Sequence, residues 1–354
     1  MKKLRLLITV VILLLLHTAL FAQNFWEKAN GPYSGNIYTI AIDKTSGIMY
    51  CGTWDGGIFR SRDNGEHWEE ANNGILNSYI YSIIVNNDGT VFAGTPSSIF
   101  KSTDFGNSWQ NCFYQFPGWI ISFAKNSRGE IFAGTNYGKV HLSTNNGINW
   151  SEIYNDGYNW IYSIAIDSSD NIFLATSYYG VLVSENNGIS WKEKNNGFFI
   201  PVIQSININH ENGKIFVGAN DGIYSSTNSG DEWIRIDSTL SSVKLIRFLS
   251  DGGLIANDFF SLWLSEDEGL IWSSITENTE VETQAIKTFV ITSKNEIYAG
   301  NSGDGIYFSS DKGSTWSFRA NGITNVQFKS MLIDHLDNIY NGTYYAGISK
   351  TTKG

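Results

Sequence analysis

The sequence predicts an all-β protein, a single β-propeller of eight four-stranded blades, and three observations lead to that prediction. Tryptophan recurs at intervals of 39 to 44 residues, which indicates a repeat protein. The shortest interval runs from 233 to 272 and the longest from 272 to 316. The same order of short apolar runs and polar turns fills each interval. The two ends of the chain are incomplete repeats that complement each other. The eight tryptophans are Trp26, Trp68, Trp109, Trp150, Trp191, Trp233, Trp272 and Trp316.

The first strand of each repeat is predicted from an alternating apolar run that follows the tryptophan and a polar turn. Period-two alternation of β-branched and aromatic residues is typical of short antiparallel strands. The polar turns include Asn-Gly at Asn73-Gly74, Asn196-Gly197 and Asn321-Gly322. The clearest of these runs cover 37–42, 81–85, 161–166 and 205–208.

Three further strands complete each repeat. The second is short and ends in small residues, as in the runs that begin at Val91, Ile131, Ile215 and Ile297. A glycine-containing turn leads to the third, such as 57–60 or 305–308, and the next tryptophan opens the fourth. No stretch of 11 or more residues carries a helical apolar stripe, so we expect no helix.

The chain ends predict how the ring closes. The chain begins with a lone fourth strand at Phe25-Trp26 and ends after a third strand at 347–350. The N-terminal strand can therefore complete the last blade and remove an exposed sheet edge. An open array, or a seven-bladed ring with one additional unit, is the alternative.

An octapeptide, Ser-x-Asp-x-Gly-x-x-Trp with Asn also allowed at its third position, precedes seven of the tryptophans. The acidic or amide side chain can accept backbone N–H bonds inside the turn, and the glycine supplies a positive φ. We expect the indole to fold back as an apolar plug between blades. The third-position residues, to which we assign a structural role, are Asp63, Asp104, Asn145, Asn186, Asn228, Asp267 and Asp311.

These seven octapeptides resemble the Asp-box, or bacterial neuraminidase repeat. That repeat is found in sialidases, sortilin-type receptors, two-propeller xyloglucanases and a photosystem II assembly factor. The resemblance spans residues 23–354 and implies a fold, since the box in these families is a structural turn remote from the active site. An amide in three of the seven copies agrees with that role, because an amide cannot act as a general acid or base.

The enzymes among these families have features that can be compared with the sequence. In sialidases, three arginines bind the substrate carboxylate and an Arg-Ile-Pro sequence precedes the first box. No Arg-Ile-Pro occurs in this chain. Arg60, Arg62 and Arg128 are expected on the Asp-box face, and Arg235 and Arg319 on outer strands. Only Arg247 falls on an inner strand that could face the channel. We therefore assign no catalytic residue, although acids dispersed over several loops are not excluded.

No cofactor or metal is expected, because the histidines His67, His141, His210 and His335 lie in different repeats without ligand spacing. Cys51 and Cys112 occupy non-equivalent positions of neighbouring repeats. We expect two separate buried thiols, with a disulfide as the alternative for an exported chain.

Residues 1–22 have the pattern of a secretory signal peptide. Lys2, Lys3 and Arg5 precede an apolar run, Leu6 to Leu16, and small Ala22 offers a cleavage point. A membrane anchor is the rival interpretation, but the run is short for a span. We expect a secreted, periplasmic or cell-surface protein without membrane insertion after cleavage.

The charge of the chain limits its partners. Without the three basic residues of the signal segment, 24 − 3 leaves 21 Lys and Arg against 34 Asp and Glu, a net charge of −13. Such an acidic chain repels phosphate, so neither nucleic acid nor an anionic membrane surface is an expected partner. We expect a monomer that binds a protein or glycan.

Aromatic residues gather in the loops of the face opposite the Asp-boxes. The second-to-third connections contribute Trp54, Tyr137, Tyr178, Tyr179, Phe259, Phe260, Tyr344 and Tyr345. The fourth-to-first connections contribute Tyr79, Phe113, Tyr114, Phe116, Trp119, Tyr154, Tyr158, Trp160, Phe198 and Phe199. From these rings and their acidic neighbours we select nine candidate ligand-binding residues: Trp54, Asp55, Trp119, Tyr137, Trp160, Tyr179, Asp221, Asp304 and Tyr345.

Three functions agree with these observations. The leading hypothesis is an exported, non-catalytic propeller that recognises a protein or glycan on its aromatic loop face. The first alternative is a glycoside hydrolase or lyase that uses dispersed acids such as Asp55, Asp221 and Asp304. The second alternative is an assembly factor for a protein complex.

Overall fold

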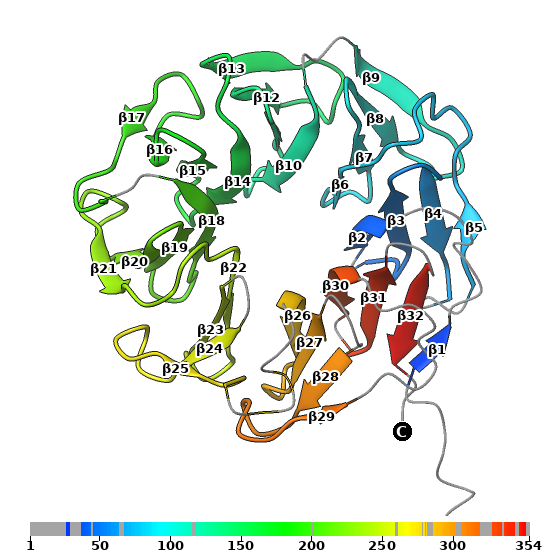
Figure 1. Ribbon diagram of the computed structural model, residues 1–354. Coiled ribbons are helices and arrows are strands. Elements are labelled where there is room, and N and C mark those ends of the chain that lie inside the picture. The colour runs from blue at the N-terminus through cyan, green and yellow to red at the C-terminus, as the bar shows by residue number, and fades with distance from the viewer. Residues whose placement is uncertain are drawn as a thin grey trace, which may run out of the picture.

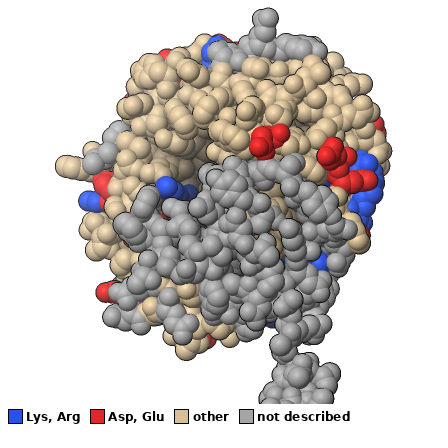
Figure 2. Space-filling view, turned by 45° about the vertical axis from the view of Figure 1, so that its right-hand side comes forward, with Lys and Arg blue, Asp and Glu red and all other residues tan. Residues whose placement is uncertain are grey.

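The chain forms eight four-stranded antiparallel sheets arranged radially around a central channel, which confirms the predicted eight-bladed propeller (Figure 1). The computed structural model describes residues 26–28, 37–43, 45–63, 67–114, 118–199, 202–258, 261–277, 279, 281, 286–301, 306–318, 328–334, 336–343 and 347–351. The ring is hollowed at its centre, and the space-filling view shows uncharged residues along the upper edge of the hollow and Lys or Arg atoms beside it (Figure 2). The predicted signal peptide, 1–22, lies outside the described residues.

In seven blades the strands run from the channel to the rim in chain order, and in the remaining blade β30, β31 and β32 are followed at the rim by β1. The innermost strands are β2 (Ile37–Ile42), β6 (Ser82–Val85), β10 (Ile120–Lys125), β14 (Ile161–Ile166), β18 (Ile203–Ile208), β22 (Leu245–Phe248), β26 (Ile286–Ile291) and β30 (Phe328–Ile333). The second strands are β3 (Met49–Thr53), β7 (Val91–Gly94), β11 (Ile131–Thr135), β15 (Ile172–Thr176), β19 (Ile215–Ala219), β23 (Leu254–Asn257), β27 (Ile297–Asn301) and β31 (Ile339–Thr343).

Two further sets complete the blades, which we number 1 to 8 from β2. The third strands are β4 (Ile58–Ser61), β8 (Ser98–Ser102), β12 (Lys139–Ser143), β16 (Val181–Ser184), β20 (Gly222–Ser226), β24 (Leu262–Ser265), β28 (Ile306–Ser309) and β32 (Ile348–Thr351). The outermost strands are β5 (Glu69–Glu70), β9 (Gln110–Tyr114), β13 (Ser151–Asn155), β17 (Lys192–Glu193), β21 (Ile234–Asp237), β25 (Ser273–Ser274), β29 (Ser317–Phe318) and β1 (Trp26–Lys28).

The strand bounds agree with the alternation in the sequence, with one systematic difference. β2 and β14 coincide with the predicted runs 37–42 and 161–166. The third strands begin and end one residue later than predicted. The predicted strand 57–60, for example, corresponds to β4 at Ile58–Ser61. Gly57 has a φ of +76° and belongs to the turn. The strand continues instead to the Asp-box serine, Ser61, whose side chain takes part in the next turn.

The N-terminal strand closes the ring. β1 pairs antiparallel with β32, with Trp26 opposite Thr351 and Lys28 opposite Ser349. Blade 8 is therefore built from both ends of the propeller, as the incomplete termini predicted. The open array and the seven-bladed ring are wrong. In the described part of the chain, no helix is long and apolar enough to cross a membrane.

The core lies between blades, and the recurring indoles contribute to it. Trp68 packs against Met49 of its own blade and Tyr340 of blade 8. The indole Nε1 of Trp233 donates a hydrogen bond of 2.8 Å to the carbonyl of Lys194, in the sequence segment that ends the preceding blade. Burying one indole of about 200 Å² stabilises the fold by at most about 5 kcal/mol. Each plug therefore couples two neighbouring blades.

Both cysteines are free thiols, as expected. Cys51 lies in β3 and is fully buried, which raises the pKa of its thiol. Cys112 lies in β9, where burial raises its pKa to about 11. Neither thiol is therefore a reactive thiolate at neutral pH.

Candidate functional site

A glycine on the second strand of a blade makes room for the blade that follows. A Cβ on Gly134 would lie 2.8 Å from Cγ2 of Ile161, the first residue of the next inner strand. The same close approach recurs between Gly94 and Ile120, at 2.7 Å, and between Gly52 and Ile80, at 2.5 Å. Glycine leaves this notch open in blades 1 to 3, and Ala175 occupies the same register position in blade 4, so the second strands end in small residues.

A hydrogen bond fixes the same isoleucine from the inner strand of the preceding blade. The Ser122 hydroxyl donates to the Ile161 carbonyl at 2.9 Å, and the Ser82 hydroxyl donates to the Ile120 carbonyl at 2.7 Å. Both bonds are buried. The start of the inner strand is thus held by packing and by a polar contact, and the residue after the isoleucine has a defined place at the channel mouth.

That next residue is the extra residue of a β-bulge. The pairing of β2 with β3 shifts between Ile37 and Thr39, so Tyr38 has no single partner, and β14 shifts likewise around Tyr162. In a bulge, the side chain of the extra residue points in a different direction from the one that regular strand alternation would give it. Both tyrosines contact aromatic rings of the adjoining loops.

The rings at the mouth form one connected set, which we name the aromatic arc. It consists of Tyr38, Trp54, Tyr79, Tyr81, Trp119, Trp160 and Tyr162. Neighbouring ring centroids are 4.9 to 6.3 Å apart, within the range of attractive aromatic pairs. The arc begins in blade 1 and ends in blade 4, on the face opposite the Asp-boxes.

The arc presents large apolar surface to solvent. Trp119 is 37% exposed and Trp160 is 39% exposed, although each contacts other rings. Tyr79 and Tyr162 are exposed to a similar degree, and Trp54, which contacts Tyr79, is half-buried. A contiguous exposed patch of this kind, unlike scattered apolar residues, marks a site of interaction.

More tyrosines extend the aromatic surface around blades 3 and 4. Tyr137 is half exposed in the turn after β11. Tyr158, Tyr178 and Tyr179 form a cluster in which the first and third rings are 6.1 Å apart and their hydroxyls share a hydrogen bond. Hydroxyl and ring groups together can both stack on and hydrogen-bond to a ligand.

The acids of this face are largely occupied by the turns that hold them. The Asp156 carboxylate accepts the Tyr154 hydroxyl at 2.9 Å and the backbone N–H of Asn159 at 3.0 Å. The Asp258 carboxylate accepts the backbone N–H of Ser261 at 2.7 Å. These carboxylates shape loops rather than project toward a ligand.

The acids proposed for the hydrolase alternative do not come together. Asp55 is exposed in the turn between β3 and β4 of blade 1. Asp221 lies in blade 5, on the other side of the channel (Figure 1), and accepts the Tyr224 hydroxyl at 2.8 Å. Glycosidases need two carboxyl groups about 5 to 9.5 Å apart, on either side of the scissile bond. Asp55 and Asp221 therefore form no such pair, and Asp304 lies outside the described residues.

The Asp-box turns use one hydrogen-bond pattern in the six copies that are described in full, and the described residues of the first copy form its other two bonds. In the second copy the Ser102 hydroxyl donates to Asp104 Oδ1 at 2.7 Å and accepts the Gly106 N–H at 2.8 Å. The same carboxylate oxygen accepts the N–H of Ser108 at 2.9 Å. An amide oxygen does this equally well, as Asn186 shows. The box is a closed local network, with its serine as an additional member that the sequence analysis did not assign.

These bonds stabilise the charged form of the acidic boxes. Burial by itself would raise the pKa of Asp104, but the bonds from Ser108 and Ser102 outweigh it and lower the pKa to about 2. The hydroxyl and N–H of Thr315 likewise lower the pKa of Asp311. A low pKa is the reverse of what a general acid needs near neutral pH.

The described basic and metal-ligating side chains form no catalytic cluster. Arg60 pairs with Glu69 at 2.6 Å, and Arg128 bridges Glu130 at 2.7 Å and Asp170 at 2.9 Å. These two arginines, from blades 1 and 3, are thus engaged locally and do not converge. Within the described residues no three His, Cys, Asp or Glu side chains could hold a metal ion.

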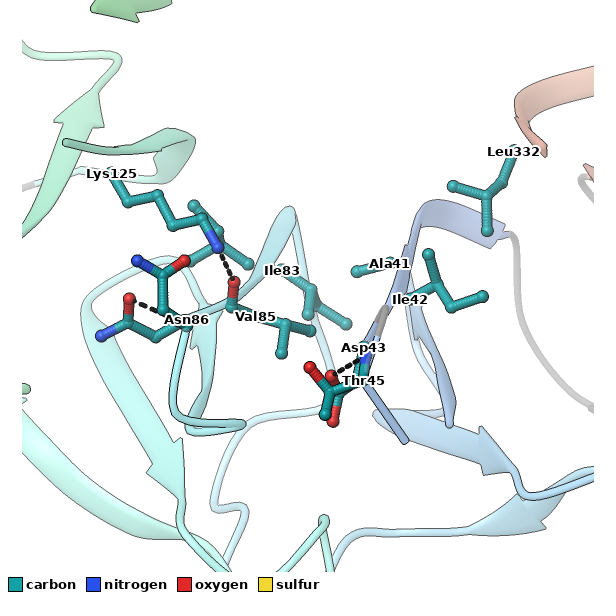
Figure 3. Close-up of a pocket in the computed structure, with 11 residues that line it drawn as sticks. Ala41, Ile42, Asp43, Thr45, Ile83, Val85, Asn86, Lys125 and Leu332 are labelled. Atoms are coloured by element: carbon teal, nitrogen blue, oxygen red, sulfur yellow. Dashed lines mark hydrogen bonds between the residues drawn. The ribbon is translucent and has the colours of Figure 1, made fainter. Parts of the chain in front are cut away.

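The channel has a pocket of about 560 Å³ at the Asp-box face (Figure 3). Its walls are mainly apolar and come from inner strands, including Ile83, Val85 and Leu332. The Lys125 ammonium donates to the Val85 carbonyl at 2.9 Å, and the Asp43 carboxylate accepts the Thr45 N–H at 2.9 Å. The polar groups drawn in this pocket are thus bound to the protein itself.

The structure brings together part of the candidate set. Trp54, Trp119 and Trp160 lie in the aromatic arc, with Asp55 beside Trp54 in its turn. Tyr137 and Tyr179 extend the surface, Asp221 lies across the channel, and Asp304 and Tyr345 lie outside the described residues. Phe113 and Tyr154, expected in connecting loops, are instead residues of the outer strands β9 and β13.

The candidate set lacked three members of the arc: Tyr38 and Tyr162 of the inner strands β2 and β14, and Tyr81 directly before β6. Each directly follows an isoleucine, in Ile37-Tyr38, Ile80-Tyr81 and Ile161-Tyr162. That repeated dipeptide was the signal by which they could have been found.

Comparisons with known proteins agree with this architecture. The family model described as photosynthesis system II assembly factor YCF48 matches residues 18–161, which is fewer than half of the 354 residues. A search of curated proteins gave no match. Together with the seven Asp-box turns and the eight-bladed ring, the match confirms the resemblance to Asp-box propellers.

Solved structures share the fold at low sequence identity. YCF48 bound to a D1 peptide is 14% identical, with a TM-score of 0.66 over 94% of this chain and 97% of that one. The Dos1 propeller is 9% identical, with a TM-score of 0.73 over 93% and 95%. An ancestral GH74 enzyme is 16% identical, with a TM-score of 0.56 over 91% of this chain and 60% of its own. These likenesses show the fold alone.

Proposed function

We propose that this chain is a non-catalytic binding protein of the assembly-factor type, which holds an extended segment of another protein on the aromatic arc. The observation that carries the proposal is the connected, partly exposed set of seven rings at the channel mouth. Tyr and Trp rings supply large contact area at a low cost in side-chain entropy, and such residues dominate binding energy at protein interfaces.

The chemistry of the face supports a binding role over a catalytic one. Among the described acids of this face, Asp156, Asp221 and Asp258 are bonded to groups of their own blades. Exposed indole N–H and phenol groups can donate to backbone carbonyls of an extended segment while its side chains pack on the rings. The neighbour of the same fold that was solved with a bound peptide adds support by analogy.

The proposal places the protein outside the cytoplasm as a monomer, on the basis of the signal-peptide pattern and the closed ring. Its acidic charge keeps it away from phosphate and anionic lipid. A glycan remains the other ligand class that stacked rings can hold, and a binding assay can compare the two.

The test is a selection from a displayed library of random dodecapeptides, beside a glycan array, with the chain lacking residues 1–22. The matched variants are Trp54→Ala/Trp119→Ala/Trp160→Ala in the arc and Ile148→Ala/Ile189→Ala/Leu270→Ala, three exposed apolar residues of Asp-box turns. We expect peptides rich in apolar residues to bind the wild type and the control but not the arc variant. Selection of glycans alone, or of peptides that bind the arc variant as well as the wild type, would overturn the proposal.

A further inference from the structure

Arg247 occupies a position of the inner strand that is uncharged in every other blade. It pairs with Ile255, the second residue of β23. The residues in the same register of the other inner strands are Ala41, Ile84, Ala124, Ala165, Asn207, Val290 and Leu332. A guanidinium has thus replaced a small or apolar side chain at one place in the ring.

This register position borders the channel. Ala41, Ile84 and Leu332, the equivalents of Arg247 in blades 1, 2 and 8, line the channel pocket of Figure 3. Arg247 itself is exposed although β23 covers the outer side of its strand, and the surrounding protein still lowers its pKa through desolvation. The Arg247 side chain is therefore accessible while neighbouring protein groups desolvate its guanidinium.

The Arg247 guanidinium has no acidic partner in the described part of the chain. Its Nη1 donates to the neighbouring carbonyl of Ile246 at 3.1 Å, and no described carboxylate lies within 4.0 Å. Each of the other described arginines has a carboxylate oxygen within 4.0 Å. Arg60 and Arg62 share Glu69, Arg128 pairs with Glu130, and Arg235 pairs with Asp221. An unpaired, partly desolvated guanidinium is a costly arrangement that an incoming anion would relieve.

The depth of Arg247 relates it to the aromatic arc. Its register equivalent Ala41 lies three residues along β2 from Tyr38, which corresponds to about 10 Å of extended strand. β22 faces β6 across the channel (Figure 1), so Arg247 lies opposite the arc and deeper than it. A segment held on the rings could therefore extend one group toward the guanidinium.

We propose that Arg247 binds a carboxylate of the segment held on the aromatic arc, so that the recognised segment combines apolar side chains with an acidic group entering the channel. This inference rests on the proposed function. A guanidinium and a carboxylate form paired, charge-assisted hydrogen bonds, which are stronger and more directional than the contact of an ammonium. The carboxylate comes either from an Asp or Glu side chain or from the end of the chain.

The test on peptides uses sequences selected by the wild-type chain. Arg247→Gln should weaken the binding of carboxylate-bearing peptides at least tenfold, as loss of one charge-assisted contact implies. Amidation of the peptide terminus, or exchange of Asp and Glu for Asn and Gln, identifies the source of the carboxylate. Peptides made neutral in this way should bind wild type and variant equally. The control Arg235→Gln removes an outer-strand guanidinium and should change nothing.

A second test needs no selected peptide. Addition of 4-phenylbutyrate, but not 4-phenylbutyramide, should shift the Nε–H resonance of Arg247 in the nuclear magnetic resonance spectrum, and the shift should vanish when the acid is protonated. Equal shifts with both compounds, or equal peptide binding by the wild type and Arg247→Gln, would overturn the inference. Neutral peptides that bind the wild type through the arc as tightly as their carboxylate-bearing parents would also overturn it, yet leave the proposed function intact. A carboxylate-specific shift without any selectable peptide would instead contradict only the proposed function.

Discussion

Tyr81 of blade 2 and Trp119 of blade 3 stack face to face, with ring centroids 4.9 Å apart and planes within 9°. This contact joins the two blades at the channel mouth and lies at the centre of the aromatic arc. Such a pair contributes about 0.5 to 1.5 kcal/mol beyond the burial of area. A double-mutant cycle with Tyr81→Ala, Trp119→Ala and both should give a coupling free energy in that range. A coupling near zero would mean that the rings stack without stabilising each other.

The glycine notch predicts a strong effect from one added methyl group. Gly134→Ala places a Cβ 2.8 Å from Ile161 and should lower the free energy of unfolding by about 2 kcal/mol or more. Ser122→Ala removes the hydroxyl oxygen that would lie nearest to the same Cβ, so the double variant should lose less than the sum of the two single losses. Chemical denaturation of the three variants measures this. Simple additivity would show that the two residues do not compete for the same space.

The Asp-box network predicts a specific dependence of stability on pH. The folded-state pKa of Asp104 is lowered to about 2, below the ordinary value of 3.8. Its stabilising contribution is therefore complete above pH 3.8 and is lost as the pH falls toward 2. Asp104→Asn should keep the turn, because Asn186 forms the same bond with its amide oxygen and also donates to Ser190 at 2.8 Å.

Thermal unfolding between pH 2 and 5 checks this expectation. Asp104→Asn should change stability by less than about 0.5 kcal/mol at neutral pH and should flatten the acid part of the curve. Asp104→Ala loses the acceptor and should destabilise at every pH. An Asp104→Asn curve as steep as that of the wild type would assign the acid sensitivity to other groups.

We expect Arg247 to strengthen ligand binding and to lower the thermal stability of the folded protein. Leu332 occupies the same register position in blade 8. Arg247→Leu therefore replaces an unpaired guanidinium by a side chain that this position accommodates elsewhere, and Tm should rise by roughly 1 to 3 °C. Calorimetry on the two proteins decides this. A clear drop in Tm would show that Arg247 supports the blade itself.

The architecture follows from local patterns that are visible in the sequence. The indole repeat, the alternating run 37–42 and the complementary ends were sufficient for the eight blades and for the pairing of β1 with β32. Each of these features acts within one repeat or at a chain end. A repeat protein is predictable in this way because its long-range contacts are copies of the contact between neighbouring units.

The candidate site was only partly predictable, because its geometry depends on contacts between blades. Tyr38 and Tyr162 reach the arc through bulges that alternation does not reveal. Asp221 was expected to face a ligand, but Tyr224 and Arg235, which follow it on the third and fourth strands, bind its carboxylate. The unusual character of Arg247 becomes clear only once the strand register identifies its seven equivalents.

The most direct measurement is the dissociation constant of the best selected dodecapeptide, determined by calorimetry for three proteins. The wild type and the variant with Ile148, Ile189 and Leu270 replaced by Ala should bind it equally. Replacement of Trp54, Trp119 and Trp160 by Ala should weaken binding at least a hundredfold, since central aromatic residues each contribute about 1 kcal/mol or more. Equal affinity of the wild type and this arc variant would contradict the account.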